Sequence, residues 1–131
     1  MFLQSRDPDM IGYVTIGSAD PAAAAAFFDP LFAELGGARA YTLETMIAWG
    51  FGPKRPLIMV TRPWNGEAAT PGNGAMIALM ARDAAQVNRL HALALSLGGR
   101  DEGAPGPRGE GFYGGYFRDP EGNKFNAFVY G

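Results

Sequence analysis

The same order of local signals occurs twice along this chain. Each time, a short run of β-branched, aromatic and other apolar residues is followed by an aspartate, a helix-forming run and the letters LGG, at Leu35 and again at Leu97. An aromatic–glycine pair recurs with the same spacing, at Phe51 and at Tyr113. Both signals recur after 62 positions (97 − 35 and 113 − 51). A fixed period of this kind indicates an internal duplication of one supersecondary unit. The sequence therefore predicts two β-α-β-β-β units in succession.

Two helices are predicted from the residues at their ends. Asp20 is suited to cap a helix that begins with a proline and runs over Pro21–Leu35, where two glycines follow. Pro30 lies inside this run, where it removes a backbone donor and crowds the preceding turn, so we expect a kink or a break there. Asp83 caps the second helix, AAQVNRLHALALSL, which is amphipathic and ends at a second glycine pair.

The remaining apolar runs are short and are bounded by Gly, Pro, Asn or Asp, which is typical of strands. We expect strands within residues 10–17, 41–52 (one or two strands), 55–63 and 75–81, and over Phe112–Arg118 and Lys124–Tyr130. A turn at DPEGN joins the last two strands. Residues 64–74 are dense in Gly, Pro and Asn, which predicts a linker.

Length and composition limit the class of protein. With 131 residues, of which 47% are apolar, the chain can bury one core and is too short for two independent domains of ordinary size. We expect a single domain over residues 1–131, with the first unit at about 10–65 and the second at about 74–131. The 11 Lys and Arg residues stand against 13 Asp and Glu and form no like-charge run, which argues against a nucleic-acid partner.

The sequence also lacks cysteine, a membrane-spanning run and a secretory signal, which narrows the class of protein further. The chain has no cysteine, which excludes disulfides, thiolate nucleophiles and cysteine-bound zinc. No apolar run approaches the roughly 20 residues of a membrane-spanning helix, and the start, MFLQSRDPDM, lacks the basic region and apolar core of a secretory signal. We therefore expect a cytoplasmic protein that has no membrane partner.

Three stretches together resemble the vicinal oxygen chelate superfamily, which includes glyoxalase I, bleomycin-resistance proteins and extradiol dioxygenases. They are IGYVTIGSADPAAAAAFFDPLFAELG, GNGAMIALMARDAAQVNRLHALALSLGG and EGAPGPRGEGFYGGYFRDPEGNKFNAF, and they cover nearly the whole chain. The resemblance implies an α+β, glyoxalase-like fold, in which two β-α-β-β-β modules form curved mixed sheets around a cavity with the helices outside. It also implies a homodimer.

The resemblance further implies where a metal would be bound. In metal-dependent members one ligand lies on the first strand of each unit and one on the last. The matching residues here are Tyr13 and Met76 on the first strands, and Asn126 and a position near Met59 on the last strands. A shift of one residue would place Ile58 at the fourth position, and Ile58 is no better a ligand. A divalent cation needs imidazole nitrogens or carboxylate oxygens, for which thioether, phenol and amide groups are poor substitutes. We therefore expect the fold without the metal centre, and we predict no metal cofactor.

Other candidates for ligand contact are cationic or aromatic. Arg108 and Tyr113 lie in the glycine-rich segment Gly103–Gly115, which we expect to be a long binding loop. The Arg108 guanidinium suits a ligand carboxylate or phosphate, and the alternative is an exposed arginine on a flexible loop. Trp49 either lines a pocket for a planar ligand or belongs to the core.

The last predicted strand sorts its side chains by alternation. One face carries Lys124, Asn126, Phe128 and Tyr130, and the other carries Phe125, Ala127 and Val129. The wholly apolar face suits packing against a helix, so we expect the mixed face to line the cavity. Asn126 then either contacts a ligand or satisfies a buried backbone group, and Met76 either contacts a ligand or fills space.

Candidates for catalysis are few. His91, the only histidine, lies in the second helix, where a structural or solvent-facing role is favoured over proton transfer. Glu44 is a carboxylate among strand-like residues, where burial would suit it to base chemistry and an outward-facing position is the simpler interpretation. No catalytic residue is assigned.

Three functions are consistent with the sequence. The favoured one is a metal-free, glyoxalase-like protein that binds a small apolar or aromatic molecule, because the signals of the fold are kept while the metal ligands are lost. The second is a lyase, isomerase or dioxygenase of the same superfamily, which acts on a small oxygenated substrate through Tyr13, Asn126, Arg108 or Glu44. The third is a fold that serves only oligomerisation or partner binding.

Overall fold

The computed structural model describes residues 10–131. The chain divides into two compact units, Met1–Ala69 and Thr70–Gly131, which we call unit 1 and unit 2. Within the described residues, no helix is both long enough and apolar enough to cross a membrane.

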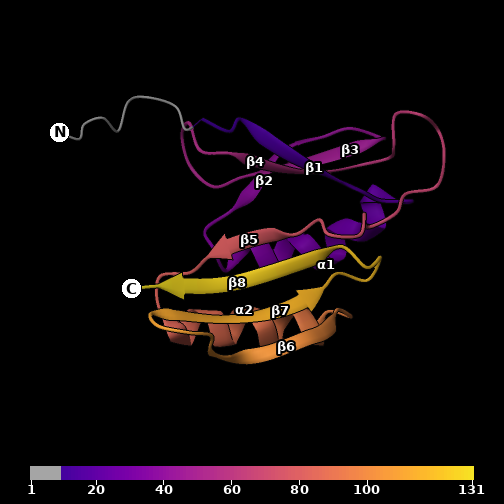
Figure 1. Cartoon of the computed structure of the whole chain (residues 1–131). Coiled ribbons are helices and arrows are strands. Elements are labelled where there is room, and N and C mark those ends of the chain that lie inside the picture. The colour runs from indigo at the N-terminus through magenta and orange to yellow at the C-terminus, as the bar shows by residue number, and fades with distance from the viewer. Residues whose placement is uncertain (1–9) are drawn as a thin grey trace. The chain divides into compact units, whose positions relative to one another are not determined.

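Unit 1 is a four-stranded mixed sheet with one helix (Figure 1). Its elements are β1 (Tyr13–Gly17), α1 (Pro21–Ala33), β2 (Ala38–Thr42), β3 (Met46–Gly50) and β4 (Leu57–Thr61). The strands lie in the order β1-β4-β3-β2, and β1 is parallel to β4 while the other neighbours are antiparallel. Helix α1 contacts β2, β3 and β4.

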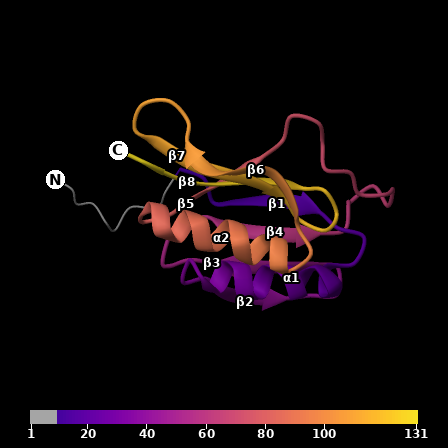
Figure 2. The ribbon, with the colours of Figure 1, turned by 90° about the horizontal axis from the view of Figure 1, so that it is seen from below.

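Unit 2 repeats this topology. Its elements are β5 (Ile77–Met80), α2 (Ala84–Ser96), β6 (Arg100–Pro107), β7 (Phe112–Arg118) and β8 (Lys124–Tyr130). The strand order is β5-β8-β7-β6, with β5 parallel to β8 and the other pairs antiparallel. Helix α2 lies along one face of this sheet (Figure 2) and contacts β6, β7 and β8. The predicted repetition of β-α-β-β-β is therefore confirmed, and so is the α+β fold class.

Both helices begin at the predicted caps. The Asp20 carboxylate accepts a hydrogen bond from the Ala23 N–H at 3.3 Å, and the Asp83 carboxylate accepts one from the Gln86 N–H at 2.8 Å. Each carboxylate satisfies one backbone donor that the first turn leaves without an intrahelical partner. The helix of unit 1 ends at Ala33, two residues before the predicted end.

We predicted a kink or a break at Pro30, and the break is wrong. Helix α1 continues through this residue to Ala33, although proline supplies no N–H to the preceding turn. Leu31 and Phe32, the two residues after it, are fully buried. We attribute the continuity to this burial, because packing of an apolar face contributes more to helix stability than local propensity does.

Aromatic rings form the core of unit 1. The rings of Phe28 and Phe32 on α1 lie 5.6 and 5.5 Å from the ring of Trp49 on β3, measured between centroids. The Trp49 indole N–H donates to Asp29 Oδ1 at 2.9 Å, and Asp29 also forms an ion pair with Arg39 of β2 at 2.8 Å. The hydrogen bond from Arg39 lowers the pKa of Asp29 from its ordinary value. Helix and sheet are thus joined by apolar packing and by one charged pair.

The core of unit 2 has fewer aromatic residues on its helix. Val87, Leu90 and Ala94 of α2 are fully buried. On the sheet, the rings of Phe117 and Phe125 stack at 5.6 Å between centroids, and the His91 ring meets Phe117 edge-on at 6.3 Å.

The segment Gly103–Gly115 is not the long loop that its glycines predicted. Strand β6 covers its first part and pairs with β7, and only a short turn around Arg108 joins the two strands. The register of β6 shifts twice along this pairing, which is how the strand accommodates its glycines and prolines. Strand β6 lies at the edge of its sheet, where proline is tolerated because one side of the strand needs no ladder hydrogen bonds.

The aromatic–glycine pair is also not equivalent in the two units. Phe51 follows the end of β3, whereas Tyr113 is the second residue of β7, the corresponding strand. The LGG repeats, by contrast, both follow the helices, and Gly36 and Gly98 both have positive φ, at 78° and 101°. Positive φ favours glycine, so the helix stop is the part of the repeat that has a structural cause.

Candidate functional site

Each sheet has one face that its helix covers, and we call the opposite face the open face. In unit 2, Phe125 belongs to the helix side, because it stacks on Phe117, which contacts His91 of α2. Lys124 and Asn126 alternate with Phe125 along β8 and therefore belong to the open face. Their cross-strand partners Arg118 and Tyr116 on β7 share that face. The predicted division of β8 into an apolar helix-facing side and a mixed side agrees with this arrangement.

The open face of unit 1 is built in the same way. Met59 of β4 lies between Thr15 of β1 and Ala48 of β3 in the register of the sheet. Tyr41 of β2 pairs with Ala48, and its hydroxyl donates to the Met59 sulfur at 3.9 Å. Tyr13 precedes Thr15 by two residues and is 60% exposed, while Met59 is 4% exposed. This face thus carries thioether, phenol and methyl groups.

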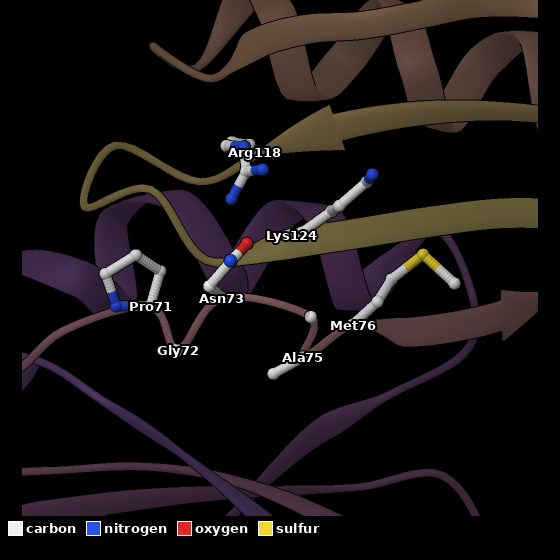
Figure 3. A pocket seen from close by; sticks show the side chains of 8 residues that line it. Pro71, Gly72, Asn73, Ala75, Met76, Arg118 and Lys124 are labelled. Carbon is white, nitrogen blue, oxygen red and sulfur yellow. The ribbon is translucent and has the colours of Figure 1, made fainter.

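Unit 2 contains a pocket of about 410 Å³ beside β8 (Figure 3). One side is formed by the segment before β5 and the other by the ends of β7 and β8. The lining residues are Pro71, Gly72, Asn73, Gly74, Ala75, Met76, Arg118 and Lys124. Two of them carry a positive charge and none carries a negative charge, so the lining favours an anion.

The cations of this pocket belong to a row across three strands. Arg100 of β6 is the register partner of Arg118, and Arg118 is the partner of Lys124. Like charges directly opposite one another in a sheet are destabilising. Glu102 offsets part of this repulsion, since its Oε1 lies 3.3 Å from Arg118 Nε. Three cations against one carboxylate leave this end of the open face positive.

The turn between the two pocket cations is closed by Asp119. Its carboxylate accepts hydrogen bonds from the Glu121 N–H at 2.9 Å, the Asn123 N–H at 2.8 Å and the Asn123 side-chain amide at 2.9 Å. Burial raises the pKa of Asp119, against the opposing effect of these donors. Arg118 also donates to the Gly122 carbonyl at 2.7 Å. The DPEGN turn therefore fixes both the spacing of β7 and β8 and the position of the guanidinium.

Comparison with known proteins now gives the family. The family model of the glyoxalase-like domain matches residues 13–128. The chain belongs to the glyoxalase-like family. This confirms the resemblance to the vicinal oxygen chelate superfamily.

Solved structures agree with this assignment. A glyoxalase/bleomycin resistance protein from Albidiferax ferrireducens T118 is 31% identical to this chain, with 94% of this chain and 100% of that chain covered and a TM-score of 0.84. A glyoxalase-related enzyme from Fulvimarina pelagi is 20% identical over 92% of this chain and 88% of its own, with a TM-score of 0.74. A lactoylglutathione lyase from Agrobacterium tumefaciens is 22% identical over 93% of this chain and 94% of its own, with a TM-score of 0.70. The last two share the fold alone. No curated protein matches the sequence.

The four positions matched to the family's metal ligands form two equivalent pairs in this glyoxalase-like chain. Tyr13 lies two residues before the register partner of Met59, and Met76 lies two residues before the register partner of Asn126. Tyr13 and Met59 therefore share the open face of unit 1. Met76 directly precedes β5 and does not lie on the strand as predicted, and it lines the pocket together with Lys124 of the open face of unit 2. The donors they offer are one phenol, two thioethers and one amide, which do not fit a hard or borderline divalent ion. In the part of the chain that the structure describes, no three His, Cys, Asp or Glu residues cluster as a metal site would need.

Asn126 supports its neighbours through its amide group. The side chain is almost fully buried, and its Nδ2 donates to the carbonyls of Gly115 at 3.0 Å and Ala127 at 3.3 Å. Gly114 makes room for it, because a Cβ there would lie 3.0 Å from Asn126 Nδ2 and 2.9 Å from the Phe112 ring. The interpretation that Asn126 satisfies buried backbone groups is therefore confirmed, while contact with a ligand stays a prediction.

The other predicted contact residues lie outside the pocket of this glyoxalase-like fold, although the Arg108 guanidinium lies 5.7 Å from the centroid of the same Tyr116 ring as Lys124. Arg108 donates to the carbonyls of its own hairpin, Ala104 at 2.7 Å and Gly106 at 3.1 Å. Trp49 is a core residue on the helix side of unit 1, as described above. Tyr113 also lies on a helix side, since its hydroxyl donates to Asn88 of α2 at 2.7 Å. None of these three lines the pocket of unit 2.

Two residues considered for proton transfer have structural or exposed positions. His91 is buried, and its Nε2 lies 3.0 Å from Asp101 Oδ1, which ties α2 to β6. The hydrogen bond from the Gly103 N–H lowers the pKa of Asp101 most, and the hydrogen bond with His91 lowers it further. Glu44 is exposed in the turn between β2 and β3. Sequence reasoning passed over Arg118 and Lys124 as ligand contacts, although Lys124 was placed on the mixed face of the last strand.

Proposed function

We propose that this glyoxalase-like chain is a cytoplasmic protein that binds a small molecule without the divalent metal centre of its metal-dependent relatives. The observation that carries the proposal is the chemistry of the four matched positions. Tyr13, Met59, Met76 and Asn126 match the family's ligand positions but offer no nitrogen ligand and no carboxylate. The fold is thus retained, while the donors that would bind the ion are replaced by groups that suit an organic ligand.

The replaced groups describe the surface that a ligand would meet. Thioethers are polarisable and adapt to irregular apolar shapes, and phenol rings offer an apolar face with a polar edge. Binding sites for small molecules are mostly apolar, with a few polar groups that orient the ligand. Met59 with the hydroxyl of Tyr41, and Met76 beside Lys124, have this composition. An apolar or aromatic ligand with a polar substituent fits such walls.

Native mass spectrometry of the protein as purified tests this proposal. The sample is then incubated with Zn²⁺, Mn²⁺ or Ni²⁺ and exchanged into metal-free buffer, and a zinc-dependent glyoxalase is treated in parallel as the control. We expect the control to retain one ion per chain and this protein to retain none. A stoichiometric ion that survives the exchange contradicts the proposal.

We also propose that the protein is a homodimer. The same native mass spectra measure the number of chains in each complex.

Enzymatic activity is the second candidate function, because the relatives include a protein named as a lactoylglutathione lyase. A lyase, isomerase or dioxygenase reaction on a small oxygenated substrate would then proceed without the usual metal ligands. Assays with hemithioacetal and catechol substrates, with and without added metals, separate the two functions. Turnover above the blank rate favours the enzyme, and inactivity throughout the panel favours the binding protein.

A further inference from the structure

We infer that the pocket of unit 2 is an oxyanion subsite, which binds the carboxylate or phosphate group of an organic ligand between Arg118, Lys124 and the turn Gly72–Ala75. The inference rests on the proposed small-molecule binding and names the chemical class of the ligand. Four observations on the described residues carry it: an anchored guanidinium, a lysine that forms no ion pair, a turn with free amides, and apolar groups beside the charges.

The Arg118 guanidinium is held in place by the protein itself. Its Nη1 donates to the Gly122 carbonyl at 2.7 Å, and its Nε lies 3.3 Å from Glu102. These contacts use Nη1 and Nε of the guanidinium and leave its third nitrogen, Nη2, to donate to another acceptor. The side chain remains 27% exposed. An arginine anchored in this way loses little conformational entropy when it binds an anion, and planar guanidinium groups pair well with carboxylate and phosphate oxygens.

Lys124 supplies a positive charge that no carboxylate offsets directly. Among residues 10–131 it forms no ion pair, and its ammonium group lies 5.5 Å from the centroid of the Tyr116 ring. Its register partner is Arg118, another cation. Cross-strand repulsion of this kind costs stability in the free protein and is relieved when an anion lies between the two groups. The arrangement is therefore better suited to the bound state than to the free one.

The segment opposite these cations is a tight turn with unused amides. The Ala75 N–H donates to the Gly72 carbonyl at 3.0 Å, and Gly72 and Gly74 both have positive φ, at 74° and 96°. The amides of Asn73 and Gly74, between these ends, have no hydrogen-bond partner within the described residues. Successive free backbone N–H groups in a turn form concavities that bind anions. Figure 3 shows the Asn73 side chain rising from this turn toward Arg118, while Lys124 extends from the start of β8 with its ammonium group directed away from the turn.

The surroundings of the charges indicate what kind of molecule carries the anion. Met76 lines the pocket and is 45% exposed, so its thioether is available to an apolar group. The Tyr116 ring lies beside Lys124 on the same open face. A ligand with an anionic head and an aromatic or aliphatic body would place its charge between the cations and its body against these side chains.

The test is a titration followed by NMR amide shifts, with three probes that share one aromatic body. Phenylacetate and phenyl phosphate carry the two candidate oxyanions, and phenylacetamide is their neutral counterpart. We expect at least one anion to shift the amides of Gly72–Met76 and of the Arg118–Lys124 turn, and to bind at least tenfold more tightly than the amide, which is the ratio expected for a charge-assisted hydrogen bond. The binding should weaken as salt is added. The stronger of the two anions identifies the head group.

Variants assign the effect to the pocket. Lys124→Gln and Arg118→Gln should each weaken anion binding by about tenfold or more, since each removes one charged donor. Arg118→Lys keeps the charge and should recover part of the affinity, which separates binding from the structural contacts of Arg118. Arg82→Gln is the matched control, because Arg82 is an exposed arginine of unit 2 outside the pocket. Thermal unfolding of each variant shows whether it is folded.

Several results would overturn the inference. One is equal affinity for phenylacetate, phenyl phosphate and phenylacetamide, or anion binding that a folded Lys124→Gln variant retains in full. Another is a set of shifted amides that lies wholly outside Gly72–Met76 and the β7–β8 turn. In these cases small-molecule binding without a metal stands and only the anion subsite fails. The absence of binding by both anions up to millimolar concentration removes the subsite, while retention of a metal ion in the mass spectrometry experiment removes the proposed function independently.

Discussion

Units 1 and 2 share one topology and differ in the charge of their open faces. Among the strand residues described in unit 1, only Arg39 is charged, and it pairs with Asp29 of α1 on the helix side. In unit 2 the strands carry five charged residues, and three cations form a row across the open face. The shared order of strands and helices comes from apolar burial and capping, which both units possess. The difference shows that one order of strands and helices supports open faces of different charge.

The substitutions with the largest expected effect on the free energy of unfolding test whether the two cores are equivalent. Phe32→Ala in unit 1 and Phe117→Ala in unit 2 each remove a fully buried ring. We expect each to lower the free energy of unfolding by about 3–5 kcal/mol, measured by urea denaturation, because a cavity remains where the ring was. Tyr130→Ala is the control, since Tyr130 is 71% exposed, and should change the free energy by no more than about 0.5 kcal/mol. A loss in one unit only would show that the cores are not equivalent.

The next prediction concerns close packing on the open face of unit 2. Gly114→Ala adds a Cβ that would lie 2.9 Å from the Phe112 ring and 3.2 Å from the Ala127 carbonyl oxygen. We expect a loss of about 1–3 kcal/mol in the free energy of unfolding, as for other overpacked sites. Gly12→Ala in unit 1 is the matched control, because a Cβ there meets no atom within 4 Å. Equal effects of the two substitutions would contradict the account of why Gly114 has no side chain.

A smaller effect is expected at the helix caps, where the two units differ in hydrogen-bond length. Asp83→Ala and Asp20→Ala each leave one first-turn donor without its acceptor, at a cost of about 1 kcal/mol. The bond of Asp83 is shorter, at 2.8 Å against 3.3 Å for Asp20. We therefore expect the Asp83 substitution to lower the melting temperature more than the Asp20 substitution. The reverse order would mean that the caps contribute through something other than these bonds.

The pKa values of two carboxylates are predicted to move in opposite directions. The pKa of Asp29 in unit 1 is lowered, chiefly by Arg39, and that of Asp119 in unit 2 is raised by burial, relative to an ordinary value near 3.8. Asp29 therefore contributes stability above its unfolded pKa and loses it as the pH falls through its folded pKa. Asp119 does the reverse, since it favours the fold below its unfolded pKa and ceases to do so as the pH rises through its folded pKa.

An NMR titration of the side-chain carboxyl groups measures both values directly, and Asp119 should titrate at a higher pH than Asp29. The Asp29 pair is partly exposed, so Arg39→Gln should cost no more than about 1 kcal/mol in the free energy of unfolding, and it should raise the pKa of Asp29. An Asp29 that titrates at the same pH in the variant would show that Arg39 is not the cause of its shift.

The sequence was sufficient for the parts of the fold that depend on local chemistry. Asp20 and Asp83 cap their helices, and β7 and β8 have the predicted bounds. Capping and the alternation of side chains depend only on residues that are close in the sequence. It was not sufficient where tertiary packing prevailed. The burial of Leu31 and Phe32 carries α1 through Pro30, and the pairing of β6 with β7 overrides its glycines and prolines.

The candidate site was harder to predict for the same reason. Arg108 attracted attention because it lies among glycines, yet its guanidinium binds its own hairpin. The pocket instead joins Arg118, at the end of one strand, to Lys124 and to a segment more than forty positions earlier in the sequence. A spacing of that size carries no periodic signal, and only the register of β7 and β8 shows that the two cations are neighbours.

The most direct test of a glyoxalase-like fold without its metal is anomalous diffraction from crystals grown with an excess of Zn²⁺ or Mn²⁺. We predict no anomalous peak within coordination distance, about 2.0–2.6 Å, of the side chains of Tyr13, Met59, Met76 and Asn126. A fully occupied ion bound to any two of these residues would contradict the central claim.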